Sequence, residues 1–233
     1  MITRHRDGDV AIIEIDRHER RNALDTAHCH DLREALTGTA RAIIITGAGS
    51  SFCAGADLGA VYDAAFRDAL YAMLTAITDT AVPVLAAVNG PAIGAGAQLA
   101  LACDLRVAAQ GATFAIPTAR LGIAVNPWTI RRLALLAGVG PAQAMLIGGE
   151  TLDTARALQC GLASRPGDRA AALTWARELA ELAPLSLAYA KKALNHPDHA
   201  ELVKDFEACW ASEDAAEGQR ARAAKRPPRF QGR

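Results

Sequence analysis

Apolar and polar residues follow two kinds of pattern along this chain. Short runs rich in valine, isoleucine and alanine, such as 10–15 (VAIIEI), are typical of buried strands. Longer runs with apolar residues at helical spacing lie between them, as in 64–78 (AAFRDALYAMLTAIT). The pattern predicts strands at 10–15, 42–46, 83–88, 105–108 and 113–115, and helices at 25–37, 64–78 and 97–102. This order predicts an α/β fold with helices packed on largely buried strands.

The carboxy-terminal part of the chain carries a different pattern. After about residue 170 only helical spacing remains, beginning with LTWARELAEL. The length of 233 residues suits one large hydrophobic core with an appendage rather than several domains. We therefore expect a core at residues 1–172 and a helical module at residues 173–233, which packs on its own core or on another subunit.

Composition narrows the class of protein. Lys and Arg together number 25, as do Asp and Glu, so no excess charge favours binding to nucleic acid or to an anionic membrane. The 5 cysteines are widely spaced and form no Cys-x-x-Cys pair, which is typical of reduced core residues. The amino terminus shows no signal peptide, and Pro83, Asn89 and Pro91 interrupt the longest apolar region, 81–103. We expect a cytoplasmic protein that is not integral to a membrane.

A glycine-rich segment, 45–58 (ITGAGSSFCAGADL), follows a predicted buried strand. Gly47 and Gly49 begin a dinucleotide-binding fingerprint, but Phe52 stands where the third glycine is needed, and the loop lies far from the first strand. The small residues at 53–57 would let a ligand approach backbone N–H groups closely. The same segment also suits a tight strand-to-helix connection that binds nothing.

Several segments together resemble the enoyl-CoA hydratase/isomerase family, the crotonase superfamily, over nearly the whole chain. The matching segments are 22–24 (NAL), 52–58 (FCAGADL), 88–104 (VNGPAIGAGAQLALACD), 120–133 (RLGIAVNPWTIRRL), 206–218 and 225–232 (KRPPRFQG). The resemblance implies a spiral core of strand-strand-helix repeats with a carboxy-terminal helical module. It also implies an acyl-CoA ligand, and homotrimers that often pair into hexamers.

The same resemblance implies which residues contact the ligand. The backbone N–H groups of Ala56 and Ala95 would donate to the thioester oxygen, where an oxyanion hole stabilises developing charge. The CoA body would lie along Arg21, Ala23, Ala54, Ala56 and Asp57. Phe206 and Lys225 match positions that reach a neighbouring subunit's ligand, with Lys225 directed to its phosphates. No covalently bound cofactor is implied, and protein partners in lipid metabolism are compatible with this assignment.

Three positions depart from the family's pattern. Hydration of an enoyl thioester needs a group that activates water and a group that delivers a proton, and the family uses two glutamates. This sequence has Gln98 and Thr118 there, and Asn126 stands where some isomerases of the family carry an acid. A carboxamide has no useful basicity near neutral pH, and a lone hydroxyl is no better. The acid–base groups are therefore replaced by neutral polar groups.

We accordingly expect an acyl-CoA-binding protein of fatty-acid metabolism with weak or no hydratase activity. One alternative is an active hydratase or isomerase that uses another acid, such as Asp57, or an enzyme whose reaction needs only enolate stabilisation. A non-enzymatic carrier, sensor or scaffold for acyl-CoA is the third interpretation. No metal site is expected, because side chains two apart on a helix, as in His28-Cys29-His30, point to different faces. Trp128 either lines the acyl pocket or fills the core.

Overall fold

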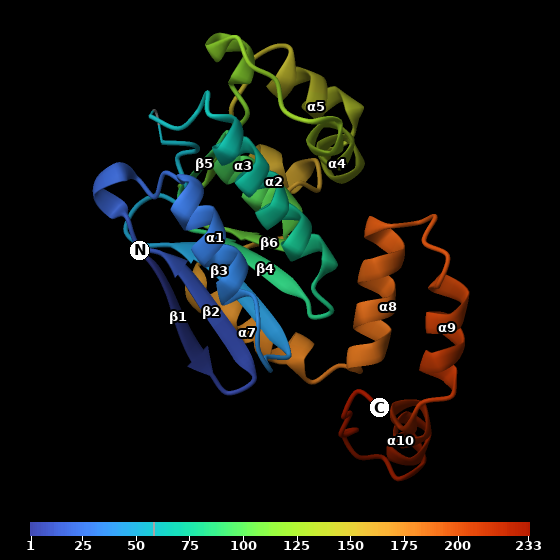
Figure 1. Ribbon diagram of the computed structural model, residues 1–233. Coiled ribbons are helices and arrows are strands. Elements are labelled where there is room, and N and C mark those ends of the chain that lie inside the picture. Colours follow the sequence, from blue (N-terminus) through green and yellow to red (C-terminus); the bar gives the residue numbers. More distant parts are fainter. Residues whose placement is uncertain (58) are drawn as a thin grey trace.

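The computed structural model describes residues 1–57 and 59–233, and its centre is a mostly parallel sheet (Figure 1). Its strands, in spatial order, are β1 (Ile2–Asp7), β2 (Val10–Ile15), β3 (Ala42–Gly47), β4 (Val84–Val88), β6 (Leu105–Ala108) and β9 (Arg165–Pro166). β1 is antiparallel to β2, whereas the other neighbours run parallel. β3 and β4 are buried along their whole length, which explains their unbroken apolar sequences.

Alternate side chains of the strands enter two different hydrophobic cores. Ile13, Ile43 and their neighbours on one face pack with α1 (Thr26–Ala35), α2 (Ala64–Asp79) and α3 (Ala95–Ala102). The other face packs against α7 (Arg169–Ala180), whose small residues Ala172, Ala176 and Ala180 recur at helical spacing. Figure 1 shows α1 and α7 on opposite sides of the sheet.

A second, smaller sheet lies beside the first and carries the loops described below. It consists of β5 (Pro91–Ile93), β7 (Thr113–Ala115) and β8 (Leu152–Asp153). A single bridge between Cys53 and Ala92 joins the glycine-rich loop to β5. The remaining elements of this part are η1 (His18–Arg20), η2 (Thr118–Leu121), α4 (Pro127–Ala137), α5 (Val139–Leu146) and α6 (Thr154–Gln159).

The predicted α/β fold is confirmed, and each strand and helix that the apolar pattern predicts is present. Four strands were not predicted: β1, β5, β8 and β9. β8 and β9 are two residues each, too short to give an apolar pattern. β1 (ITRHRD) is polar because it is an edge strand that pairs only with β2 and leaves Arg4, His5 and Arg6 exposed. β5 is only three residues long and contains proline, so its apolar signal is weak.

Three helices extend away from the sheet: α8 (Pro184–Asn195), α9 (Leu202–Trp210) and α10 (Glu213–Ala223) (Figure 1). The buried Lys191 of α8 ties them to the sheet, since its Nζ lies 2.8 Å from Asp104 Oδ2 and donates to the Val82 carbonyl at 3.0 Å. Within the described residues, no helix is both long enough and apolar enough to cross a membrane.

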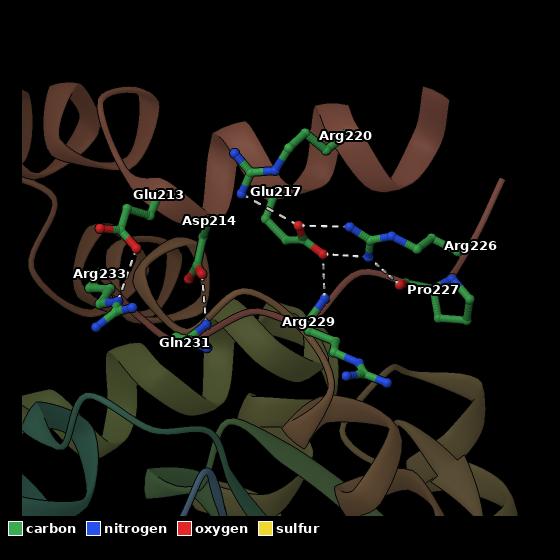
Figure 2. A pocket seen from close by; sticks show the side chains of 9 residues that line it. All are labelled: Glu213, Asp214, Glu217, Arg220, Arg226, Pro227, Arg229, Gln231 and Arg233. Atoms are coloured by element: carbon green, nitrogen blue, oxygen red, sulfur yellow. Dashed lines mark hydrogen bonds and ion pairs between the residues drawn. The ribbon is translucent and has the colours of Figure 1, made fainter. Parts of the chain in front are cut away.

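The last residues of the chain fold back onto α10 and are held by its acidic side chains (Figure 2). Asp214 is buried and accepts two backbone N–H groups of the tail, at 2.7 and 2.8 Å. Glu217 lies 2.6 Å from Arg226 Nη1 and accepts the N–H of Arg229 at 3.0 Å. These contacts hold the pKa of Glu217 down to about 2. The tail is thus an ordered part of the helical module.

We expect the contribution of Glu217 to stability to depend on pH. Because its pKa is depressed in the folded state, the contribution is present above its ordinary pKa of 4.5 and is lost as the pH falls towards about 2. The difference in melting temperature between wild type and Glu217→Gln should therefore shrink between these values. Glu19→Gln, which removes an exposed carboxylate, is the control. A difference that stays constant down to pH 2 would contradict this expectation.

Candidate functional site

A cavity of about 440 Å³ is lined by residues of α2, the start of α3 and the loops around them. Its walls come from the loop at 54–56, the start of α2, the β5–α3 junction, and η2 with the segment after it. Most of the lining is apolar, and five of the predicted site residues contribute to it: Ala54, Ala56, Ala95, Gln98 and Thr118. Residues from four separate parts of the chain therefore share one cavity.

The two glycine-rich loops are locked together beside this cavity. Cys53 N–H donates to the Pro91 carbonyl at 3.0 Å, and Ile93 N–H donates to the Cys53 carbonyl at 2.9 Å. Gly96, in the first turn of α3, faces that same carbonyl, and a Cβ atom there would overlap it. Gly55 adopts φ +112°, a region that favours glycine. The last residue of the FCAGADL motif, Leu58, lies outside the described residues.

Gly96→Ala is expected to destabilise the protein, because the added methyl group would push α3 away from the first loop. Overpacking of this kind typically costs about 1–3 kcal/mol. Gly140→Ala is a matched control, since Gly140 occupies the same position in the first turn of α5 and a Cβ atom there meets nothing within 4 Å. Thermal unfolding of both variants tests the difference. Equal melting temperatures would contradict the packing described here.

The backbone N–H groups of Ala56 and Ala95, two of the lining residues, have no carbonyl partner among the described residues, and the same holds for Gly55 in the first loop. Two backbone groups next to the Ala56 N–H are already hydrogen-bonded to Leu24. The Gly55 carbonyl accepts the Leu24 N–H, and the Asp57 N–H donates to the Leu24 carbonyl. Ala95 is the first residue of α3, so its N–H lies at the positive end of that helix. The two loops together can thus offer two donors to an oxygen atom.

Two arginines, the buried Arg106 and the half-buried Arg132, satisfy the opposite end of α3. The Arg106 guanidinium donates to the carbonyls of Ala100 at 3.2 Å and Cys103 at 2.8 Å, and Arg132 donates to the Leu101 carbonyl at 3.1 Å. Burial lowers the pKa of Arg106 to about 10, which leaves it protonated at neutral pH. Cations at a helix carboxy terminus stabilise the helix dipole. The helix that presents Ala95 is therefore fixed at both ends.

One wall of the cavity carries neutral polar side chains. Gln98 is buried on α3, and its Oε1 lies 2.9 Å from the hydroxyl oxygen of Thr129. The same hydroxyl lies 2.9 Å from Asn126 Oδ1. Thr118 begins η2, and its hydroxyl makes no hydrogen bond within the part of the chain that the structure describes. No carboxylate occupies either of the two positions where the family's glutamates are expected.

Asn126 lies behind the cavity wall rather than in it. Its side chain caps α4, where Oδ1 accepts the N–H of Thr129 at 2.9 Å. Its own backbone N–H donates to the hydroxyl of Tyr71 at 3.0 Å, and Tyr71 does line the cavity. Asn126 therefore supports both Thr129 and Tyr71, and its capping role could have been read from the Asn-Pro pair that begins the helix.

The residues expected along the CoA body fall into two groups. Ala54 lies in the cavity lining, and its N–H donates to the Arg21 carbonyl at 2.9 Å, which joins the NAL segment to the loop. Ala23 and Asp57 lie beside this loop but do not line the cavity. The Asp57 carboxylate accepts the Gly59 N–H at 3.1 Å and forms an ion pair with Arg17 at 2.8 Å. Both contacts lower the pKa of Asp57.

Phe206 and Lys225 lie elsewhere, on the helical module. Phe206 is 42 % exposed on α9 and packs beside the rings of Tyr189 and Trp210. Lys225 follows α10 with an exposed side chain. Figure 1 shows these helices on the far side of the molecule from the β5–α3 junction. Within one subunit, neither Phe206 nor Lys225 therefore lines the cavity.

Asp63, Tyr71 and Thr129 are among the residues of the site that were not predicted from sequence. Asp63 is the single carboxylate of the described cavity lining, and it caps α2 by accepting the Ala65 N–H at 2.9 Å. Tyr71 and Thr129 contribute the contacts described above. A cap signal, an aspartate just before a helical run, could have identified Asp63. Trp128 packs against the core and does not line the cavity. Among the described residues, no three side chains form a cluster suited to a metal.

Comparison with known proteins agrees with this geometry. The model of the enoyl-CoA hydratase/isomerase family matches residues 5–233. The chain therefore belongs to the enoyl-CoA hydratase/isomerase family. It is 47 % identical over 236 residues to the Mycobacterium tuberculosis protein named "Probable enoyl-CoA hydratase echA6", with 96 % of both chains covered. It is 36 % identical to carnitinyl-CoA dehydratase of Citrobacter koseri, covering 99 % of this chain and 97 % of that one.

Solved structures of the family share the fold. The enoyl-CoA hydratase of Bacillus anthracis superposes with a TM-score of 0.90 at 28 % identity, covering 100 % of this chain and 99 % of that one. An enoyl-CoA hydratase/carnithine racemase of Magnetospirillum magneticum gives 0.90 at 26 % identity, covering 100 % and 96 %. The crotonase-like fold expected from the sequence motifs is confirmed.

Proposed function

We propose that this family member binds acyl thioesters of CoA in the cavity and hydrates enoyl thioesters weakly or not at all. One observation carries the proposal: Ala56 and Ala95, whose backbone N–H groups are unpaired among the described residues, line the same cavity as the neutral side chains of Gln98 and Thr118. The donors suit a thioester oxygen. The wall lacks a base or acid that titrates near neutral pH. The ligand is thus bound and polarised, but water is not activated.

The apolar remainder of the cavity suits an acyl chain. Phe66 and Leu70 of α2 line it together with Ile123 and Val125. The CoA body would leave along the loop at 54–56, past Arg21, Ala23 and Asp57. This arrangement favours a role in fatty-acid metabolism, as carrier, sensor or scaffold for the thioester.

Asp63 favours a second candidate function, a slow hydratase or isomerase. It lies at the cavity rim and is exposed, so a substrate could reach its carboxylate. Asp57 suits this role less well, because it lies outside the lining and pairs with Arg17 at 2.8 Å. If crotonyl-CoA is hydrated slowly, Asp63→Asn should abolish the activity, whereas Asp57→Asn should not.

The two functions are distinguished on one preparation. Loss of the enoyl absorbance measures hydration of crotonyl-CoA, and calorimetry measures binding of saturated acyl-CoA thioesters of increasing chain length. Saturable binding with little or no hydration supports the binding function. Rapid hydration by the wild-type protein would refute the weak-activity proposal, and failure to bind any thioester would refute both functions.

We also propose that copies of this chain assemble into a closed ring, a trimer or paired trimers. Large apolar side chains are exposed on two separate regions, which fits a heterologous contact between copies. One region is on α8 and α9, with Leu194, Val203 and Trp210 at 77, 74 and 72 % exposure. The other is on α4, α5 and the residue after α5, with Leu135, Val139 and Ile147 at 79, 63 and 82 %. In a ring, Phe206 and Lys225 of one copy would approach the ligand of the next.

Trp210→Glu is expected to dissociate this assembly, because it places a charge in the centre of an apolar contact. Light scattering after size exclusion should show a smaller particle. Affinity for acyl-CoA should fall as well, since the neighbour's Phe206 and Lys225 are withdrawn. Glu207→Gln, an exposed change on the same helix, is the control. A monomeric wild-type protein that binds acyl-CoA tightly would contradict the ring proposal while leaving the binding function intact.

A further inference from the structure

The hydroxyl of Thr129 lies between two carboxamides in the interior of the protein. It is 2.9 Å from Gln98 Oε1 on one side and 2.9 Å from Asn126 Oδ1 on the other. Thr129 is 0 % exposed and Gln98 is 4 % exposed. Solvent therefore has little access to the Thr129 hydroxyl, which must be satisfied by these two neighbours.

The orientation of the Asn126 amide is fixed by the helix cap. Its Oδ1 accepts the backbone N–H of Thr129 at 2.9 Å, so an oxygen atom must stand there. The Thr129 hydroxyl has one proton and faces this oxygen. With Gln98 Oε1 also next to the hydroxyl, two acceptor oxygens have to share that single proton. One of the two short contacts would then join oxygen atoms with no hydrogen between them, which a buried site disfavours.

Turning the Gln98 carboxamide by 180° about its last bond removes this conflict and moves no other group. Nε2 then donates to the Thr129 hydroxyl oxygen, and the hydroxyl donates to Asn126 Oδ1. Each contact now has one proton. We infer that Thr129 is a positioning residue that holds Gln98 by its amide nitrogen and turns Oε1 towards the cavity.

This orientation determines which ligands the wall can recognise, and the inference rests on the proposed binding of acyl thioesters. Gln98 lies three residues after Ala95, one turn along the same face of α3, so it stands about 4.5 Å beyond the proposed thioester donor. A substituent on carbon 3 of the acyl chain is within reach there. Oε1 would accept a hydrogen bond, and the Thr118 hydroxyl could donate one. The wall therefore favours a hydroxyl group on carbon 3.

Three ligands of equal chain length test this in the wild-type protein: octanoyl-CoA, 3-hydroxyoctanoyl-CoA and 3-fluorooctanoyl-CoA, the last two as separate enantiomers. Fluorine is close to a hydroxyl group in size but donates no proton. We expect one 3-hydroxy enantiomer to bind about fivefold tighter than its fluoro analogue, the effect of one net hydrogen bond. Equal affinities would overturn the inference while octanoyl-CoA binding still supported the proposed function. If no thioester binds, the proposed function itself fails.

Variants of the positioning residue separate its role from a structural one. Thr129→Val keeps the shape but removes the hydroxyl, so Gln98 can turn either end to the cavity. The ratio of hydroxy to fluoro affinity should fall towards one in this variant, and Thr129→Ser should restore it. A ratio within one variant is not changed by a general loss of affinity. A preference that persists in Thr129→Val would overturn the role of Thr129, even if the wild-type preference holds.

Discussion

Glutamate at both Gln98 and Thr118 is expected to raise crotonyl-CoA hydration by about 10²–10⁴-fold over wild type. Both positions line the cavity that also contains the unpaired N–H groups of Ala56 and Ala95. The substitutions would therefore add acid–base groups to an existing electrophilic site. Rates are measured by loss of the enoyl absorbance at saturating substrate.

The two positions differ in burial, so the two new carboxylates should have different pKa values and different roles. Gln98 is 4 % exposed, so a glutamate there is desolvated, which raises its pKa and favours a proton donor. A protonated carboxyl there can donate to the Thr129 hydroxyl oxygen, which also favours the neutral form. Thr118 begins an exposed turn, where a glutamate stays ionised and can activate water. A pH–rate profile with one rising and one falling limb is the expected signature of such a pair.

Controls separate catalysis from a change of packing. Gln98→Met and Thr118→Gln alter the same sites without an ionisable group and should remain inactive. Each single glutamate variant should give less than the double one, although the two effects need not multiply. A double variant that folds and binds octanoyl-CoA but hydrates no faster than wild type would show that geometry, rather than the missing acids, limits the reaction.

The features that sequence could predict are those encoded by local pattern or by backbone. β3 and β4 are unbroken apolar runs because both faces are buried, and such runs need no knowledge of their neighbours. The loops at 54–56 and 94–96 act through main-chain atoms, so small residues at fixed spacing suffice to identify them.

The features that sequence could not predict depend on side chains distant in sequence. Thr129 reaches Gln98 across 31 positions, and nothing in NPWTIRRL indicates that contact. Asp63 carries a helix-cap signal, but its place at the cavity rim depends on how α2 packs. The polar strand β1 is an edge strand, so its sequence lacks the apolar alternation that marks the others. In each case tertiary packing gives an ordinary residue its role.

Ala95→Pro is expected to remove the second backbone donor while leaving α3 intact. Ala95 is the first residue of the helix, a position at which the N–H has no partner within the helix and proline is well tolerated. The loss should be large in a reaction that needs enolate stabilisation. Placed on the Gln98→Glu, Thr118→Glu double variant, it should lower the hydration rate by about 10²–10³-fold, as removal of one oxyanion donor does.

The effect on binding should depend on the thioester carbonyl. Free CoA lacks that oxygen, so its affinity should change little in Ala95→Pro, whereas the affinity for octanoyl-CoA should fall about tenfold or more through loss of the hydrogen bond and crowding by the proline ring. Ala95→Gly keeps the N–H and should retain most of the octanoyl-CoA affinity. The same loss for free CoA and octanoyl-CoA would mean that proline had displaced the loop, and Ala95 would then not be a thioester donor.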